Sequence, residues 1–226
     1  MSGFDLADPA LDDRERTRRA ELVLSLRSRG VLHTRTLKAI ETIPRALFTP
    51  SRFRDVAYVD RSLPIACGQT LEAPSTIATM LDGLGVGDLD TVLEIGCGSG
   101  YVTAILSRLA RRVVAVERFQ TLAENAERRL ADLGGADGVT IHVGDGALGW
   151  PSPSPYERIL VSAAVKAPPS ALLNQLKPGG TMLAPIGDAD GQRLTRIVKN
   201  KDGSLDETTI GVARAQPMMA GVAAGL

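Results

Sequence analysis

Glycines and a carboxylate occur together in the most informative segment of the sequence. Residues 92–101 read Val-Leu-Glu-Ile-Gly-Cys-Gly-Ser-Gly-Tyr, an apolar run followed by glycines at alternate positions. A glycine turn between a strand and a helix lets a ligand lie against bare backbone at the carboxyl end of the strand. The dinucleotide pattern G-x-G-x-x-G is not met, because Tyr101 stands where its third glycine is required. The spacing therefore disfavours a nicotinamide-dependent dehydrogenase and indicates another nucleotide-like ligand.

Three acidic residues near this turn and the next two predicted strands indicate what that ligand is. Glu94 comes two residues before Gly96, where an anion suits a cationic ligand better than a pyrophosphate. Glu117 ends the second predicted strand, where an acid can accept from both ribose hydroxyls. Asp145 lies in a Gly-Asp-Gly turn after the third predicted strand and can accept a hydrogen bond from an adenine amino group. S-adenosylmethionine, which carries an ammonium, a sulfonium and an adenosine, fits this set.

Alternating strands and helices position these residues. Short β-branched runs predict strands over 91–95, 113–117, 139–143, 158–161 and 181–186, and helical spacing predicts helices over 101–110, 122–133 and 171–176. This order is typical of an α/β fold with a doubly wound, mostly parallel sheet. Two further runs, over 193–198 and 207–212, predict an antiparallel hairpin that closes one edge of the sheet.

The chain before this region reads as a helical extension. Gly30 breaks the first of two N-terminal helices, Thr34 is a candidate cap for the second, and Pro74 opens a third that runs to about Leu84. We expect residues 1–85 to form a helical and substrate-covering segment, and residues 86–226 to form the cofactor-binding core. The two parts are expected to make one compact domain.

Composition excludes several classes of protein. Lys+Arg and Asp+Glu each number 26, and the aromatic residues are four Phe, three Tyr and one Trp, so we expect no nucleic-acid partner. No run approaches the roughly 20 apolar residues of a membrane span, so we expect no membrane partner. Cys67 and Cys97 have neither disulfide-framework nor metal-site spacing, and no metal is expected. Because residues 1–16 also have no apolar signal-peptide run, a cytoplasmic location is expected.

Beyond the glycine turn, further segments carry a family resemblance. Over about residues 20–218 the sequence resembles the protein-L-isoaspartate O-methyltransferase family of S-adenosylmethionine-dependent methyltransferases. The Gly-Gln-Thr segment before a helix is specific to that family, whereas the glycine turn is common to many methyltransferases. The segments that carry the resemblance are Ile43–Pro50, Asp55–Tyr58, Leu63–Ile65, Gly68–Thr70 and Gln175–Gly180.

The resemblance implies a Rossmann-like fold and an activity. The family transfers a methyl group from S-adenosylmethionine to L-isoaspartyl or D-aspartyl carboxylates in damaged proteins, leaves S-adenosylhomocysteine, and so initiates repair. It implies catalytic roles for Thr70 and Glu72, and substrate contacts for Gln69, Ala73 and Lys166. The implied cofactor contacts are Leu71, Glu94, Gly96, Cys97, Gly98, Gly100, Glu117, Arg118, Asp145 and Gly146.

Three departures from the family pattern fall in segments that the family uses for substrate. Glu72 stands where the family has an active-site serine, and Lys166 stands where proline is typical. The C-terminal pattern of an aromatic residue, valine, proline and leucine becomes Ala215-Gln216-Pro217-Met218. Substrate identity is therefore the part of the function that the resemblance supports least.

Glu72 leaves several interpretations open. It can turn outward or cap the helix that opens at Pro74, it can pair with Lys166, or it can serve a changed substrate as a general base or counter-ion. Two alternatives to the family reaction follow. One is a methyltransferase of the same fold with another acceptor, and the other is a protein that binds S-adenosylmethionine without transferring its methyl group.

Overall fold

A twisted β-sheet forms the centre of the computed structural model, which describes residues 9–134 and 137–223. Within these ranges, seven strands pair in the order β5-β4-β3-β6-β7-β8-β9. Neighbouring strands from β5 to β7 are parallel, whereas β7–β8 and β8–β9 are antiparallel. The predicted sheet and its closing hairpin are confirmed. The strands are β3 (Thr91–Ile95), β4 (Arg112–Glu117), β5 (Val139–Val143), β6 (Tyr156–Val161), β7 (Leu176–Asp188), β8 (Gly191–Lys199) and β9 (Leu205–Ala213).

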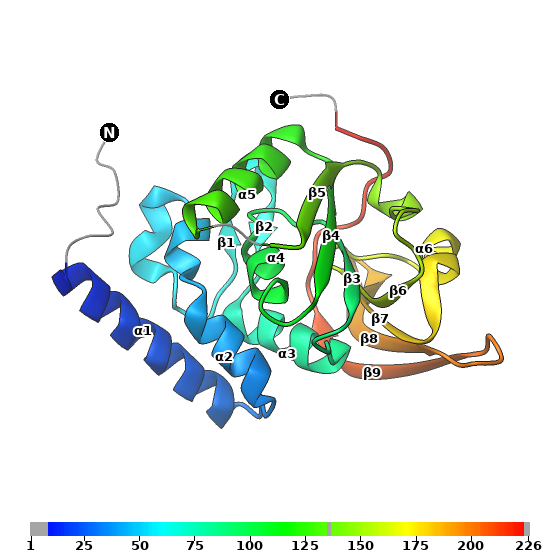
Figure 1. The fold of residues 1–226 in the computed structure, drawn as a ribbon, viewed down its shortest axis with the longest axis horizontal. Coiled ribbons are helices and arrows are strands. Elements are labelled where there is room, and N and C mark those ends of the chain that lie inside the picture. Colours follow the sequence, from blue (N-terminus) through cyan, green and yellow to red (C-terminus); the bar gives the residue numbers. More distant parts are fainter. Residues whose placement is uncertain (1–8, 135–136, 224–226) are drawn as a thin grey trace.

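Helices cover both faces of this sheet. Figure 1 shows α1 and α2 on the side of the molecule away from α6. Successive residues of β3 pack into different clusters: Val92 joins the one that contains residues of α1–α5, and Leu93 joins the one that contains Leu172 of α6. Because side chains alternate across a strand, continuous apolar strands need cover on both faces. The helices are α1 (Pro9–Ser28), α2 (Thr34–Thr42), α3 (Pro74–Leu84), α4 (Tyr101–Leu106), α5 (Gln120–Asp132) and α6 (Ser170–Gln175).

The N-terminal helices differ from prediction in one detail. Gly30, with φ +94°, follows the end of α1, as expected of a helix-breaking glycine. The prediction that Thr34 caps α2 is wrong, because Thr34 is already helical and His33 occupies the cap position without a side-chain cap hydrogen bond. The Nδ1 atom of His33 lies 3.1 Å from a carboxylate oxygen of Asp82 in α3 instead.

Some other element bounds also differ. The helix predicted over 101–110 ends at Leu106, because the amides of Arg108 and Leu109 bond three residues back in a tighter turn. Strand β7 begins at Leu176, the last residue of the helix predicted over 171–176, rather than at residue 181, because Leu176 pairs with Tyr156 across an irregularity in register. Gly134 and Gly135 follow the helix predicted over 122–133 and are expected to stop it; Gly135 lies outside the described residues.

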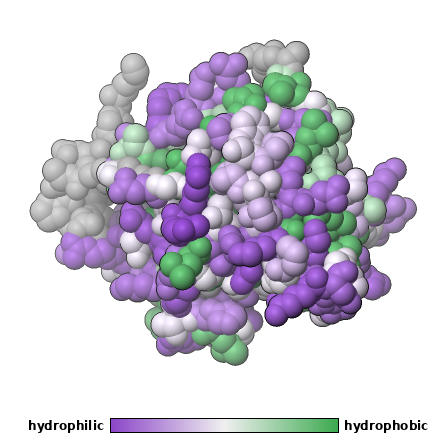
Figure 2. Space-filling model, turned by 45° about the vertical axis from the view of Figure 1, so that its right-hand side comes forward, coloured by the Kyte–Doolittle hydropathy of each residue, from purple (hydrophilic) through white to green (hydrophobic). Residues whose placement is uncertain are grey.

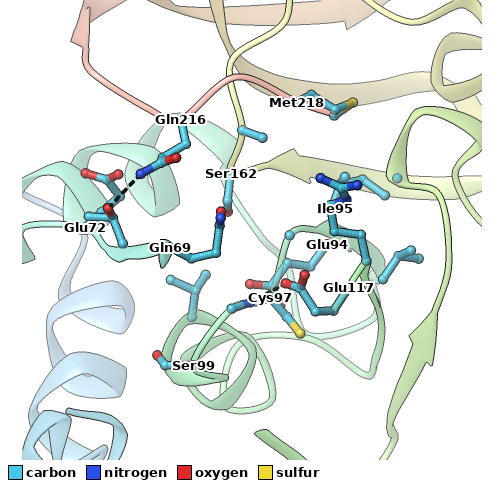
Figure 3. Close-up of a pocket in the computed structure, with 18 of the residues that line it drawn as sticks. Gln69, Glu72, Glu94, Ile95, Cys97, Ser99, Glu117, Ser162, Gln216 and Met218 are labelled. Carbon is cyan, nitrogen blue, oxygen red and sulfur yellow. Dashed lines mark hydrogen bonds between the residues drawn. The ribbon is translucent and has the colours of Figure 1, made fainter. Parts of the chain in front are cut away.

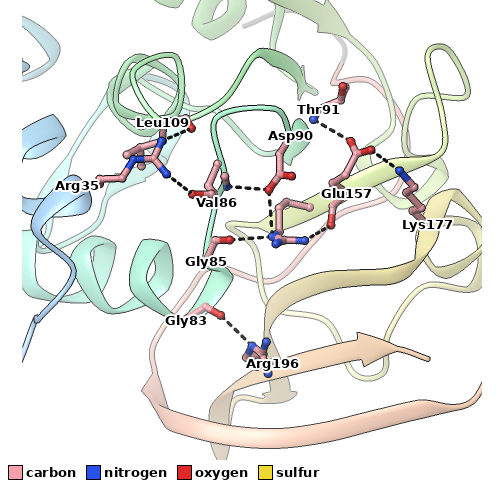
Figure 4. A network of polar contacts seen from close by, with 12 residues as sticks. Arg35, Gly83, Gly85, Val86, Asp90, Thr91, Leu109, Glu157, Lys177 and Arg196 are labelled. Carbon is pink, nitrogen blue, oxygen red and sulfur yellow. Dashed lines mark hydrogen bonds and ion pairs between the residues drawn. The ribbon is translucent and has the colours of Figure 1, made fainter. Parts of the chain in front are cut away.

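A polar network joins the amino ends of β3 and β6 to the turn after α3 (Figure 4). Glu157 accepts hydrogen bonds of 2.9 Å from the amide of Thr91 and from Lys177, and Asp90 pairs with Arg158 at 3.3 Å. Arg158 also donates to the carbonyl of Gly85. These contacts hold one end of the sheet, so the opposite carboxyl ends of β3, β4 and β6 remain for a binding site.

Large hydrophobic side chains that remain exposed come from separate segments: Leu89 lies in the turn before β3, and Val212 lies in β9. On the face shown in Figure 2, hydrophobic residues are scattered among hydrophilic ones. None of the helices that the structure describes is both long and apolar enough to cross a membrane.

Candidate active site

A cavity of about 230 Å³ opens at the carboxyl ends of β3, β4 and β6. In Figure 3, Glu94 and Glu117 lie at one end of it, and Glu72 and Gln216 lie at the other. The cavity brings together most of the predicted site residues. They are Gln69, Thr70, Leu71, Glu72, Glu94, Gly96, Cys97, Gly98, Glu117, Arg118 and Gly146.

The glycine turn after β3 forms one wall. Gly96 and Gly98 have φ values of +82° and +53°, a region that side-chain-bearing residues rarely adopt, and both line the cavity. Gly100, at φ +85°, does not line it. A Cβ atom there would lie 2.8 Å from the Cβ of Ala126, so Gly100 allows the turn to pack against α5. The predicted cofactor contact of Gly100 has no counterpart in the lining of the cavity.

Glu94 supplies a buried carboxylate at the end of β3. Its side chain is fully buried, and its Oε2 atom accepts a 2.6 Å hydrogen bond from the hydroxyl of Thr103. Its Oε1 atom has no hydrogen-bond partner among the described residues. Burial raises the pKa of Glu94 from its ordinary value of 4.5 to about 7. An unpartnered, cavity-lining carboxylate oxygen is a site for a cationic hydrogen-bond donor.

Glu117, at the end of β4, is held in place by two backbone amides. Its Oε2 accepts from Gly98 at 2.9 Å and its Oε1 from Phe119 at 3.0 Å. The side chain is buried and lines the cavity. Each carboxylate oxygen keeps a further lone pair, so the oriented group can still accept from a diol.

Asp145, the predicted adenine contact, does not line the cavity, although its neighbour Gly146 does. The Oδ1 atom of Asp145 accepts from the amide of Ala147 at 2.9 Å, and its Oδ2 atom accepts from the amide of Gly221 at 2.8 Å. A Cβ atom at Gly146 would lie 2.4 Å from Ile95 Cγ2, so this position requires glycine. Asp145 thus anchors the C-terminal tail, residues 216–223.

The opposite end of the cavity is built by residues 69–72, which overlap β2 (Thr70–Leu71), the partner of β1 (Leu63–Pro64). Ala73, the predicted substrate contact, occupies the cap position of α3 and does not line the cavity. Asp60, rather than Glu72, accepts a hydrogen bond from an amide of the first turn of α3, that of Ser75.

Glu72 is half-buried and faces the cavity. Its Oε2 atom accepts a 3.1 Å hydrogen bond from the hydroxyl of Ser62, and burial raises its pKa. It does not cap α3, so that interpretation is wrong. The expected pair with Lys166 is also absent: Lys166 is exposed, does not line the cavity, and forms no ion pair within residues 9–134 and 137–223.

The tail crosses the cavity after the last strand. The side chain of Gln216 donates to the carbonyl of Gly68 at 3.3 Å and to the hydroxyl of Thr70 at 3.4 Å. Arg118 donates to the carbonyl of Gly221 at 3.2 Å. The tail therefore contacts both the segment Gly68–Thr70 and Arg118, the residue after β4.

Sequence reasoning missed about half of the lining. Ile77 and Met80 share a face of α3 at helical spacing, a signal that points to burial but not to a cavity. Gln216, Pro217 and Met218 stand out in the sequence only as a departure from the family's C-terminal pattern, and no site role was predicted for them. The missed residues are Ile77, Met80, Ile95, Ser99, Val102, Val116, Ser162, Ala163, Gln216, Pro217, Met218 and Met219.

Comparisons with known proteins show which family this chain belongs to. The sequence model of the family described as protein-L-isoaspartate(D-aspartate) O-methyltransferase (PCMT) matches residues 17–220. The protein-L-isoaspartate O-methyltransferase of Parvibaculum lavamentivorans is 44% identical over 219 residues, which cover 96% of this chain and 97% of its own. That of Azorhizobium caulinodans is 45% identical over 213 residues, 94% of this chain and 97% of its own.

Solved structures show the same architecture. A protein-L-isoaspartate O-methyltransferase structure superposes with a TM-score of 0.80 at 30% identity, covering 90% of this chain and 67% of the other. A Plasmodium falciparum structure described as a protein-L-isoaspartate O-methyltransferase in complex with S-adenosyl-L-homocysteine shares the fold with a TM-score of 0.77 at 19% identity, covering 88% of this chain and 97% of its own. The predicted family resemblance is confirmed, and this chain belongs to the protein-L-isoaspartate(D-aspartate) O-methyltransferase family.

Proposed function

We propose that this cavity is where the enzyme transfers the methyl group of S-adenosylmethionine to L-isoaspartyl or D-aspartyl carboxylates of damaged proteins. S-adenosylhomocysteine is the other product, and the methyl ester initiates repair. Family membership over residues 17–220 supports the reaction. One observation carries the location: a single cavity joins the unpartnered Oε1 of Glu94 to the segment 69–72.

The cofactor end of the cavity fits S-adenosylmethionine, which when bound supplies an electrophilic methyl group. Glu94 accepts from the ammonium, because its Oε1 atom is buried and has no partner among the described residues. Glu117 accepts from the ribose hydroxyls with a carboxylate already oriented by two amides. Gly96 and Gly98 line the cavity without side chains, so a bound group can approach their backbone closely. Leu71, Cys97 and Arg118 contribute to the walls.

The acceptor end needs alignment more than acid-base chemistry. A peptide carboxylate has a pKa near ~4 and is already ionised at neutral pH, so no general base is required. We assign Gln69 and Thr70 to positioning the acceptor. The apolar side chains of Ile77, Met80 and Met218 keep water from the reacting groups. Orientation and water exclusion of this kind are worth up to roughly 7–11 kcal/mol in well-aligned systems.

The test is transfer of labelled methyl from S-adenosylmethionine to an isoaspartyl peptide and to its normal aspartyl twin. We expect label in the isoaspartyl peptide alone. Lys201→Ala, at an exposed turn between β8 and β9, is the control variant and is expected to match the native protein. Tight cofactor binding with no label in either peptide would refute the proposal.

We also propose a cytoplasmic location. The two free cysteines, Cys67 and Cys97, support it, because oxidising compartments favour disulfides. Fractionation of cells that express the protein tests this, and recovery outside the cytoplasmic fraction would contradict it.

A further inference from the structure

The acceptor end of the cavity holds a carboxyl group, that of Glu72, which the proposed transfer does not need as a general base. Glu72 lines the cavity, is half-buried, and is fixed by the hydroxyl of Ser62 at 3.1 Å. The acceptor group of an isoaspartyl residue is also a carboxylate. Two carboxylates in one cavity repel each other, so a bound peptide is favoured if it brings a positive charge to Glu72.

The neighbouring cations of the protein do not neutralise Glu72 from within the cavity. Arg45 is fully buried, and its Nε and Nη2 atoms donate to the carbonyls of Ala57 and Glu72. Arg45 favours the ionised form of Glu72, but its guanidinium does not line the cavity. Lys166 is exposed and also outside the lining. A peptide in the cavity therefore meets the carboxylate of Glu72 without an accompanying cation from the lining at that end.

The position of Glu72 suits a residue that flanks the reacting one. It lies in the same extended segment as Gln69 and Thr70, and Figure 3 shows it beside Gln216 at the end of the cavity away from Glu94. Gln216 adds an amide that bonds to the Thr70 hydroxyl. A hydrogen-bond-donating cation matches the charge and the acceptors at this end of the site.

We propose that Glu72 forms a subsite for a positively charged side chain next to the isoaspartyl residue, so that damaged sites flanked by Lys or Arg are preferred to those flanked by Asp or Glu. This inference rests on the proposed function and names the peptide class that the acceptor end selects. It also gives Glu72 a specificity role that a serine at this position does not have.

The experiment compares isoaspartyl hexapeptides that carry Lys, Ala or Glu on either side of the isoaspartyl residue. We expect kcat/KM for the Lys peptide to exceed that for the Glu peptide by about tenfold, mainly through KM, because a partly exposed pair of charges contributes modestly in each direction. The ratio is expected to shrink when salt rises from about 20 mM to about 500 mM.

Two variants separate charge from structure. Glu72→Gln keeps the size and an acceptor for Ser62, and it is expected to bring the Lys-to-Glu ratio close to one. Ser62→Ala keeps the charge, and it is expected to retain the preference. A native ratio near one at low salt, or the same ratio in Glu72→Gln as in the native enzyme, would overturn the inference while leaving the proposed function intact.

The native enzyme alone decides the matter if a variant does not fold, since its peptide and salt dependence already test the charge. Transfer to none of the isoaspartyl peptides would instead refute the proposed function, and the inference with it.

Discussion

The Nη2 atom of Arg45 donates a 2.6 Å hydrogen bond to the main-chain carbonyl of Glu72. The same buried guanidinium donates through Nε to Ala57 at 2.8 Å and lies 5.1 Å from the ring centre of Tyr101, the first residue of α4. One cation therefore contacts the main chain at Ala57, the main chain at Glu72 and the helix α4, which follows the glycine turn. Position 72 is where the family resemblance predicts a serine. The main chain at this position is held by the hydrogen bond from Arg45.

Arg45→Met is expected to lower the free energy of unfolding by about 2–4 kcal/mol, because two carbonyls lose their donor. Urea denaturation measures this. Arg214→Met, at an exposed position, is the control and is expected to stay within about 0.5 kcal/mol of native. Equal midpoints for the two variants would contradict the tethering role of Arg45.

The raised pKa of Glu94 makes stability depend on pH. Its pKa is about 7 in the folded protein against an ordinary 4.5, so the folded state holds an extra proton between these values. Stability without cofactor is therefore expected to fall as pH rises from about 4.5 to 7, by on the order of 3 kcal/mol from this group. Glu94→Gln is expected to lack this fall, and an unchanged pH slope in that variant would refute the assignment.

Cofactor affinity should show the opposite trend. The ionised form of Glu94 accepts from an ammonium, so the affinity for S-adenosylmethionine is expected to increase as pH rises through about 7. Glu94→Gln is expected to bind roughly 10 to 100 times more weakly at neutral pH and to show a flatter profile. Calorimetric titration across pH measures both. A variant that binds like the native protein would show that Glu94 does not contact the cofactor.

Gly100→Ala tests the close approach of the glycine turn to α5. The added Cβ atom would lie 2.8 Å from that of Ala126, at a φ of +85°. We expect a loss of about 2–4 kcal/mol, from a left-handed backbone plus overpacking. Gly179→Ala has a similar φ of +83° and open space, and is expected to lose only about 1–2 kcal/mol. Equal losses would show that packing against Ala126 adds nothing.

Removal of the tail from Gln216 onward is expected to speed release of S-adenosylhomocysteine by about tenfold or more. The bonds from Gly221 to Asp145 and from Arg118 to Gly221 are then lost, and each is worth about 1 kcal/mol. Stopped-flow displacement measures the rate. Val222→Ala, at an exposed side chain, is the control and is expected to release at the native rate. An unchanged rate in the truncated protein would contradict a covering role.

The parts of the fold that local sequence determines were predicted well. Strands β3 and β5 match their predicted bounds, because β-branched apolar runs between turn residues favour extended chain. Residues 177–180 lie outside the predicted strand over 181–186, yet they are extended, because the pairing of Leu176 with Tyr156 overrides the local preference of proline and glycine. Local patterns therefore give the elements but not the pairing that lengthens them.

In the candidate site, too, residues that local sequence patterns define were predictable, whereas contacts between residues far apart in the chain were not. Glu94 and Glu117 were predictable because strand ends and glycine turns define their positions in the chain. The partner of Asp145 was not, because Gly221 is 76 residues away and belongs to no regular element. The role of Arg45 was hidden for a similar reason, since its acceptors are 12 and 27 residues further along.

The tail also sets the order in which the site is completed during synthesis. Residues 216–219 supply part of the cavity lining, and they follow the last strand, β9, in the chain. A nascent chain that has been synthesised as far as Glu117 contains the glycine turn, Glu94 and Glu117, but it still lacks this part of the cavity lining. The complete lining of the cavity therefore forms only after the last strand of the sheet has been synthesised.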